Sequence, residues 1–541
     1  MMADKIYLGN VITMDEANPN AEAVVVCDGL ISYVGNRDKA LEYKGNNTEM
    51  IDLGTNSIYP GFLESHCHPL AAGEILDKDA NADLSAGEST EEYVEILRDF
   101  INKHPERSIY NGNSFAERDV KPTAAMLDAI CPDKPVVIKS ADGHSAWLNS
   151  VAMEQFGIDK AAVKKYGEDM VRVDENGNPT GYLSETPVFE IYKNLPVDKK
   201  ARMGFILKAQ EFFFSKGYTG VYDAGIEIID KNCHEYYKEL TKEGSLKLRT
   251  YAGSIIDENC QDIKSAVENI IKMQDDNSEY YKIIGVKAFS DGVVEAHTAY
   301  LIDDYCDQPG YKGVQRLTDH DALTEIYILA SENGLSVHVH TIGDAAVKCN
   351  LDAMEEAVKA TGKVDNRNVL CHLQVVKDTD IQRFADLKVS AAVGSLWAPK
   401  EADYFAQEVE YMGKERAENA YPVKSFEDVG ANVLFHTDYP VSPVVNIPWA
   451  IYSAEKRKHY FGTPDTVRGP KEAISRYQAL SALTKNAAYA WHEESRLGSL
   501  EIGKIANMSV FSSDFIKDDL EKVANAKLVC TIVDGEIVYK A

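Results

Sequence analysis

The stretch Pro60-Gly61-Phe62-Leu63-Glu64-Ser65-His66-Cys67-His68-Pro69 contains the most informative pair of residues in the chain. An apolar segment, Ser57-Ile58-Tyr59, and a Pro-Gly bend precede the two histidines, so we expect them to lie on a strand. Residues i and i+2 of a strand point to the same face. Both imidazoles can therefore reach one metal ion. Such pairs also occur as ordinary polar residues at strand ends, and residues further along the chain decide between the two interpretations.

The composition is that of a large globular protein with an acidic surface. The chain has 541 residues, of which 45% are hydrophobic and 26% charged, and its formal net charge is −29. Such a charge repels nucleic acid phosphates and anionic membranes. The nine cysteines are scattered without a Cys-x-x-Cys pair, which is typical of a reducing compartment. With no visible signal peptide or membrane-spanning stretch, we expect a cytoplasmic protein without a nucleic acid or membrane partner.

The two ends of the chain share a pattern of short strands with Gly, Asn and Asp at the turns. The N-terminal strands fall within residues 4–57, and the C-terminal ones lie between Met508 and Tyr539. Neither end alone has enough strands for a stable sheet. We therefore predict one small composite β-sandwich domain, built from residues 1–57 and 498–541.

The middle of the chain alternates buried strands with amphipathic helices, which is typical of parallel β/α units. We predict a (β/α)8 TIM barrel over residues 58–497, with an α/β subdomain inserted at about 70–200. Seven barrel strands are clear, and the eighth is predicted at either Ser108-Ile109-Tyr110 or Val136-Val137-Ile138-Lys139. The other six after the His66 strand are expected at 220–223, 283–289, 335–340, 368–372, 389–393 and 432–436.

Polar residues gather where these barrel strands end. The active site of such a barrel lies at the C-terminal ends of its strands. Buried polar groups are costly unless they are paired or bind a metal, so this set indicates a metal site. Its members are His66, His68, Lys287, His340, His372 and Asp438.

In this order the residues resemble the amidohydrolase superfamily. The most similar branch is amidohydrolase-3, the metal-dependent hydrolases that resemble N-substituted formamide deformylase. The likeness covers nearly the whole chain and includes the Pro-Gly-Phe-x-x-Ser-His-x-His stretch. It continues through Asp142-Gly143-His144, His340-Thr341-Ile342-Gly343-Asp344, Thr437-Asp438-Tyr439-Pro440 and Gly498-Ser499-Leu500-Glu501-Ile502-Gly503-Lys504.

The resemblance implies a role for each residue of the set. His66 and His68 would bind the more buried metal, and His340 and His372 the second. Lys287 would carry CO2 as a carbamate that bridges the two ions, because a lysine of depressed pKa offers the neutral amine that reacts. Asp438 would bind the first metal and act as the catalytic proton acceptor.

Two of these assignments have alternatives. Lys287 could be a plain lysine paired with Asp291. His338 shares a strand face with His340, and we favour His340 as the ligand because Ile-Gly-Asp comes shortly after it.

The resemblance also implies cofactors and a reaction. We expect two Zn²⁺ ions per chain, with Fe, Mn or Ni as alternatives. The expected reaction is hydrolysis of an amide-type C–N bond in an N-substituted amide, formamide or cyclic amide by a metal-activated hydroxide. Alternatives are deaminase or isomerase chemistry on the same site, and a non-catalytic scaffold. The expected partner is a small-molecule amide, and a homodimer is the default assembly.

Three further residues are candidates for substrate binding: His144, Asp291 and His297. His144 could also be a turn residue, and His297 stands where relatives usually have arginine. Cys67 and Cys371 flank predicted ligands in the sequence, and strand alternation predicts that both face the core instead.

Overall fold

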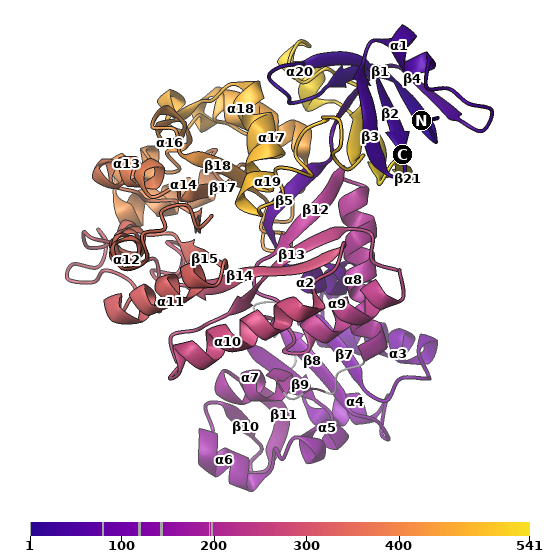
Figure 1. Ribbon diagram of the computed structural model, residues 1–541. Coiled ribbons are helices and arrows are strands. Elements are labelled where there is room, and N and C mark those ends of the chain that lie inside the picture. The colour runs from indigo at the N-terminus through magenta and orange to yellow at the C-terminus, as the bar shows by residue number, and fades with distance from the viewer. Residues whose placement is uncertain (1, 78–80, 117–120, 141–143, 194, 196–198) are drawn as a thin grey trace. The chain divides into compact units, whose positions relative to one another are not determined.

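The computed structural model describes residues 2–77, 81–116, 121–140, 144–193, 195 and 199–541 (Figure 1). The chain divides into two compact units. One unit comprises Met1–Ala72 and Ile206–Ala541, and the other comprises Gly73–Phe205. Among the described residues, no helix is long and apolar enough to cross a membrane.

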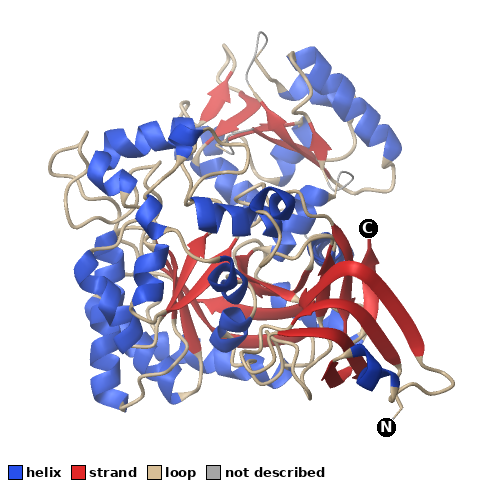
Figure 2. Cartoon of the chain, turned by 90° about the horizontal axis from the view of Figure 1, so that it is seen from above, coloured by secondary structure: helices blue, strands red, loops and turns tan. Residues whose placement is uncertain are grey.

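Eight parallel strands of the first unit form a barrel, which confirms the predicted fold class. Their order is β18-β17-β16-β15-β14-β13-β12-β5, and β18 also contacts β5, which brings the two edges of the sheet together. Helices pack outside these strands (Figure 2). The strands are β5 (Phe62–Cys67), β12 (Tyr218–Asp223), β13 (Arg249–Ile255), β14 (Tyr281–Phe289), β15 (Ser336–Thr341), β16 (Val369–His372), β17 (Ser390–Gly394) and β18 (Asn432–His436).

The helices of the barrel begin and end at recognisable signals. The carboxylate of Asp319 caps α11 (His320–Glu332) by accepting a hydrogen bond from the Ala322 amide. Helix α12 (Asp344–Thr361) stops at Gly362, whose φ of 71° is left-handed. Other helices outside the strands are α9 (Cys233–Lys242), α10 (Ile263–Met273), α13 (Asp378–Asp386), α16 (Val423–Asp428) and α17 (Ile447–Lys456).

Both predicted positions of the eighth barrel strand are wrong. The segments 108–110 and 136–139 contribute to β7 (Tyr110–Phe115) and β8 (Val136–Ser140), which belong to a different sheet in the second unit. The missing strand is β13, in which Arg249 and Gly253 weaken the apolar pattern. Arg249 tolerates burial because its Nη2 lies 2.8 Å from the Glu279 carboxylate and 2.5 Å from that of Asp534.

Strands from both ends of the chain join in one seven-stranded sheet. Its order is β21-β20-β19-β4-β1-β2-β3, and both termini lie at this sheet (Figure 1). The antiparallel pair of β4 and β19 links the ends, with Pro60 opposite Met508. The strands are β1 (Lys5–Ile12), β2 (Asn20–Cys27), β3 (Leu30–Gly35), β4 (Glu49–Pro60), β19 (Met508–Phe511), β20 (Leu528–Val533) and β21 (Glu536–Lys540).

Gly61 separates this sheet from the first barrel strand. A Cβ atom at Gly61 would lie 2.1 Å from Oγ1 of Thr219, so only glycine lets β5 approach β12 this closely. The strand-like segment Ser57-Ile58-Tyr59 therefore belongs to the terminal sheet, and β5 carries the two histidines into the barrel.

The second unit contains a six-stranded sheet of its own, in the order β10-β11-β9-β8-β7-β6. Trp147 on β9 is fully buried in its core with Tyr93 and Phe115. Asp142 and Gly143, which belong to the stretch Asp142-Gly143-His144 that supports the family resemblance, lie outside the described residues. The remaining strands are β6 (Ala82–Asp83), β9 (Ser145–Leu148), β10 (Val171–Val173) and β11 (Pro179–Ser184), and the longest helix is α3 (Thr90–Lys103).

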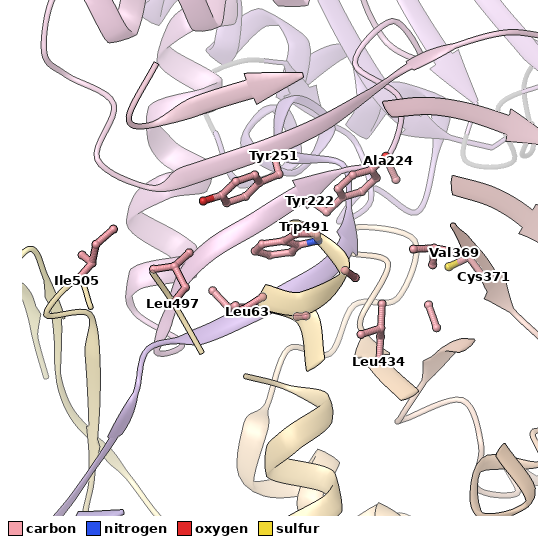
Figure 3. Packing of buried hydrophobic residues seen from close by; sticks show 14 residues of the cluster. Leu63, Tyr222, Ala224, Tyr251, Val369, Cys371, Leu434, Trp491, Leu497 and Ile505 are labelled. Atoms are coloured by element: carbon pink, nitrogen blue, oxygen red, sulfur yellow. The ribbon is translucent and has the colours of Figure 1, made fainter. Parts of the chain in front are cut away.

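An apolar plug fills the barrel interior below the strand ends. Trp491, which comes directly after α19 (Lys485–Ala490), stacks on Tyr251 with ring centroids 4.7 Å apart. Leu63 and Tyr222 belong to the same buried cluster as Trp491 (Figure 3). The predicted metal ligands lie beyond this plug, at the C-terminal ends of the strands.

Candidate metal centre

His66, His68 and Asp438 converge on one carboxylate oxygen. Oδ1 of Asp438 lies 3.1 Å from Nε2 of His68 and 3.5 Å from Nε2 of His66. Neither contact has hydrogen-bond geometry, and Oδ1 is buried without a hydrogen-bond donor among the described residues. Two imidazole nitrogens and a carboxylate oxygen are the ligands that zinc prefers.

Backbone hydrogen bonds join β5 to the loop after β18 and so fix this geometry. The Asp438 amide donates to the His66 carbonyl at 2.9 Å, and the His68 amide donates to the Tyr439 carbonyl at 2.9 Å. Oε1 of the buried Glu64 accepts from the amides of Thr437 at 2.9 Å and His66 at 3.2 Å. Burial raises the pKa of Glu64 to about 8. Through these two hydrogen bonds, Glu64 connects the backbone at His66 to the backbone just before Asp438.

His340 and His372 form a second pair at the ends of β15 and β16. Their ring centroids lie 4.5 Å apart. Nε2 of His340 donates to the Gly292 carbonyl at 3.1 Å, so Nδ1 is the nitrogen left for a metal. Burial lowers the pKa of His340 to about 4, which keeps the ring neutral and able to bind a cation.

Lys287 lies in the interior on β14, in register with His338 on β15. Its side chain is fully buried, and its Nζ has no hydrogen-bond partner among the described residues. Burial lowers the pKa of Lys287 to about 8. A buried, unpaired amine is costly, and the structure gives Lys287 no ion pair with Asp291.

A further group of side chains lies beneath the predicted ligands. Nδ1 of His66 lies 2.8 Å from Nε2 of His338, and the His338 ring stacks on Tyr222 at 4.5 Å. Burial lowers the pKa of both histidines well below the usual value, so both are neutral. A neutral imidazole has one N–H. With that proton on Nδ1 donated to His338, the lone pair of His66 Nε2 faces Asp438.

Cys371 contacts this group, and the prediction that it faces away from the ligands is wrong. Its Sγ lies 3.0 Å from Nδ1 of His66. Cys371 is in register with the inward-facing His340. His372 leaves the strand with a φ of 82°, so the alternation of faces no longer separates the two neighbours.

The residues present fit a divalent metal. Several buried polar atoms lack a hydrogen-bond partner among the described residues, although such atoms are normally satisfied. They are Asp438 Oδ1, His68 Nδ1, Lys287 Nζ and both ring nitrogens of His436. The potential ligand atoms of His66, His68 and Asp438 all lie within 4.8 Å of one another. A cation would satisfy the carboxylate oxygen, for which the described part of the protein supplies no donor.

The three residues proposed for substrate binding lie in different surroundings. The carboxylate of Asp291 is buried and accepts hydrogen bonds from the amides of Tyr300, Ile342 and Gly343 at 2.7–3.0 Å. Nε2 of His297 lies 2.7 Å from the Asp307 carboxylate. His144 is exposed in the second unit.

In the second unit, Nδ1 of His144 lies 3.3 Å from the Glu185 carboxylate. Substrate binding by His144, Asp291 and His297 stays a prediction.

Sequence reasoning missed two residues at strand ends. Asp223 ends β12, where the Tyr237 hydroxyl donates to its carboxylate at 2.8 Å and burial raises its pKa to about 6. Trp397 lies just after β17, and its ring stacks on His372 with centroids 5.3 Å apart and an interplanar angle of 17°. Both stand at the ends of strands that the sequence predicted. A search for every polar or aromatic residue at those ends, rather than for likely ligands alone, would have included them.

Comparison with known proteins identifies relatives along the whole chain. The sequence model of the amidohydrolase family matches residues 49–539. The putative amidohydrolase YtcJ of Bacillus subtilis is 27% identical and aligns over 98% of both chains. N-substituted formamide deformylase of Arthrobacter pascens is 25% identical, over 99% of this chain and 98% of its own.

A solved structure is also similar to this chain over most of its length. An uncharacterised metal-dependent hydrolase from Pyrococcus furiosus superposes with a TM-score of 0.76 at 26% identity. The match covers 95% of this chain and 100% of the other.

Proposed function

Because this chain belongs to the amidohydrolase family of metal-dependent hydrolases, we propose that it hydrolyses an amide-type C–N bond in a small N-substituted amide, formamide or cyclic amide. The observation that carries the proposal is the convergence of His66, His68 and Asp438 on a carboxylate oxygen without a donor among the described residues. The likeness to N-substituted formamide deformylase supports the choice of bond.

In this proposal the residues hold two divalent ions, zinc being the first choice. His66, His68 and Asp438 bind the first, and His340 and His372 the second. Lys287, as a CO2-derived carbamate, would supply a carboxylate to both ions. An amine with a pKa of about 8 is roughly one-tenth neutral at pH 7, far more than an exposed lysine. The neutral fraction is the form that reacts with CO2.

The chain's own groups would handle the proton. Divalent ions, when bound, lower the pKa of a water molecule toward about 7 and polarise a carbonyl. The Asp438 carboxylate is positioned beside this centre to accept a proton and to pass it to the leaving amine. Donation from Nδ1 of His66 to Nε2 of His338, 2.8 Å away, would leave Nε2 of His66 as the nitrogen that binds the first ion.

Metal content of purified protein, measured by elemental mass spectrometry, tests the proposal. We expect about two ions per chain in the native protein and one or fewer in a Lys287→Ala variant. The matched control is Lys282→Ala, which removes a lysine from the opposite half of the same strand β14 and should retain both ions. One ion in all three proteins would contradict the bridge and favour mononuclear, deaminase-like chemistry.

A Lys287→Glu variant separates the carbamate from a merely structural lysine. Glutamate supplies a carboxylate without CO2, so this variant should retain more of the second metal than Lys287→Ala and should not respond to bicarbonate. N-formyl and N-acyl amines are then screened by the release of free amine. No turnover of any such amide by the two-metal protein would overturn the proposed reaction.

A further inference from the structure

A cavity of about 620 Å³ opens in the first unit beside the metal centre. Its lining is largely apolar and includes six aromatic side chains. Phe461 is 76% exposed, Val441 68% and Tyr404 54%, so these three lie on the solvent side of the lining. The aromatic members are Trp397, Tyr404, Tyr421, Trp449, Tyr460 and Phe461.

The cavity begins where the predicted metal ligands end. Trp397 forms part of its wall and stacks on His372, so one indole ring contacts both the cavity and the metal centre. A Cβ atom at Gly394 would lie 2.8 Å from this indole, so a glycine is needed there for the ring to pack. Ile342 and Gln374, two residues beyond His340 and His372, also line the cavity. A molecule in the cavity therefore has one end at the metal centre.

The charges of the lining disfavour an anion. Arg468 is the one guanidinium among the described residues of the lining, and both terminal nitrogens donate to the two carboxylate oxygens of Glu408. This pair is buried, and Gln374 donates to the same carboxylate at 2.7 Å. Burial lowers the pKa of His459, so that ring is neutral near pH 7. Arg468 is thus already neutralised by its partner.

Two more carboxylates line the cavity, Glu295 and Glu401. Acidic groups beside aromatic faces suit a cation, since a ring face attracts positive charge. Amide hydrolysis produces such a cation when the leaving amine takes up a proton. The amine side of the substrate therefore matches this cavity better than a carboxylate would.

We propose that the cavity binds the N-substituent of the amide, and that this substituent carries a flat apolar ring and no negative charge. Trp397 is the specificity-determining residue on which the ring stacks. This inference rests on the proposed function and narrows its substrate class. Ring-bearing, neutral or cationic amines are accepted, and amides of amino acids or other carboxylates are excluded.

Calorimetric binding of product-like amines to the metal-loaded protein tests this without turnover. The probes are benzylamine, its 4-sulfonate and n-butylamine, which share the amine and differ in charge or ring. We expect benzylamine to bind at least about tenfold more tightly than either of the others. Equal or tighter binding of the sulfonate, or no binding of benzylamine, would overturn the inference.

Substitutions of cavity residues test where the benzylamine ring binds. Trp397→Ala should weaken benzylamine binding about tenfold, and Trp397→Phe should restore most of it. Phe461→Ala changes an exposed side chain and should give a smaller loss without a folding defect. Tyr33→Ala, in the terminal sheet, is the control that should bind normally. Unchanged affinity in both Trp397→Ala and Phe461→Ala would exclude this cavity.

The chemistry and the cavity can fail separately. N-methylformamide, which has no ring, reports the reaction alone. Turnover of this amide without ring-selective binding would overturn only the inference about the cavity. Ring-selective binding of amines without turnover of any amide would overturn only the proposed reaction.

Discussion

The two ends of the barrel interior are built by the same strands and differ in almost every other respect. On β5, Leu63 packs into the apolar plug and His66 faces the metal centre. On β18, Leu434 packs into the plug, and His436 is a buried histidine whose ring nitrogens lack partners among the described residues. In the plug, two tyrosine hydroxyls, those of Tyr222 and Tyr251, lack a hydrogen-bond partner among the described residues, whereas at the other end the atoms without such a partner belong to imidazole, amine and carboxylate groups that can bind a metal. Stability and chemistry are thus separated along each strand.

This division between the two ends predicts which property a substitution changes. Apolar side chains gain stability by packing alone. Unpartnered polar groups lower stability in the absence of a ligand and gain their value only when one binds. Substitutions in the plug should therefore change folding, and those at the strand ends should change metal binding and activity.

The largest effect is expected at Asp438. Asp438→Asn removes the negative charge that faces His66 and His68 and the acceptor for the proton. We expect kcat/KM for a cleaved amide to fall by about 10³-fold or more, with an unchanged thermal midpoint for the metal-free protein. A loss of folding instead of activity would contradict the division between the two ends.

The plug should show the opposite behaviour. Trp491→Ala leaves a cavity beside Tyr251 and Leu63, and we expect a loss of about 3–5 kcal/mol of unfolding free energy in chemical denaturation. Metal content per folded chain should stay the same. Reduced metal content in the folded fraction would show that the plug and the metal centre are coupled.

His338 lies between the two regions and should affect metal affinity. His338→Phe preserves the ring on Tyr222 and removes the acceptor for His66, so we expect metal affinity to fall about 10–100-fold in a chelator competition. His338→Gln, which restores an acceptor, should recover part of the loss. The control His320→Ala, on the exposed start of α11, should bind normally.

The smallest effect is expected at Lys287, and it tests the division between the two ends most directly. Lys287→Met replaces a buried amine, which has no hydrogen-bond acceptor among the described residues and lies 4.6 Å from the centroid of the Phe289 ring, with an apolar side chain of similar length. In metal-free protein we expect an increase of about 1–3 kcal/mol in unfolding free energy, although the variant should lose its second metal. Destabilisation of the metal-free protein would mean that the contact of Lys287 with the Phe289 ring outweighs the cost of burying the amine.

Much of the fold could be predicted from local patterns. Alternating strands and helices predicted the barrel, and the turn-rich ends predicted strands that join in one sheet. The eighth strand was missed because Arg249 and Gly253 interrupt the apolar run of β13, and ion pairs with Glu279 and Asp534, remote in sequence, allow that arginine to be buried. Segments 108–110 and 136–139 are genuine strands, but periodicity cannot say which sheet a strand joins.

The sequence by itself determined which residue types stand at the strand ends, because the His-x-His spacing and the ends of buried strands are local properties. Only the tertiary structure decided that Cys371 and His338 contact His66, that Trp397 stacks on His372, and that Glu408 neutralises Arg468. These contacts depend on the register between neighbouring strands and on loops that meet across the barrel. Neither is encoded in the spacing of residues along one segment.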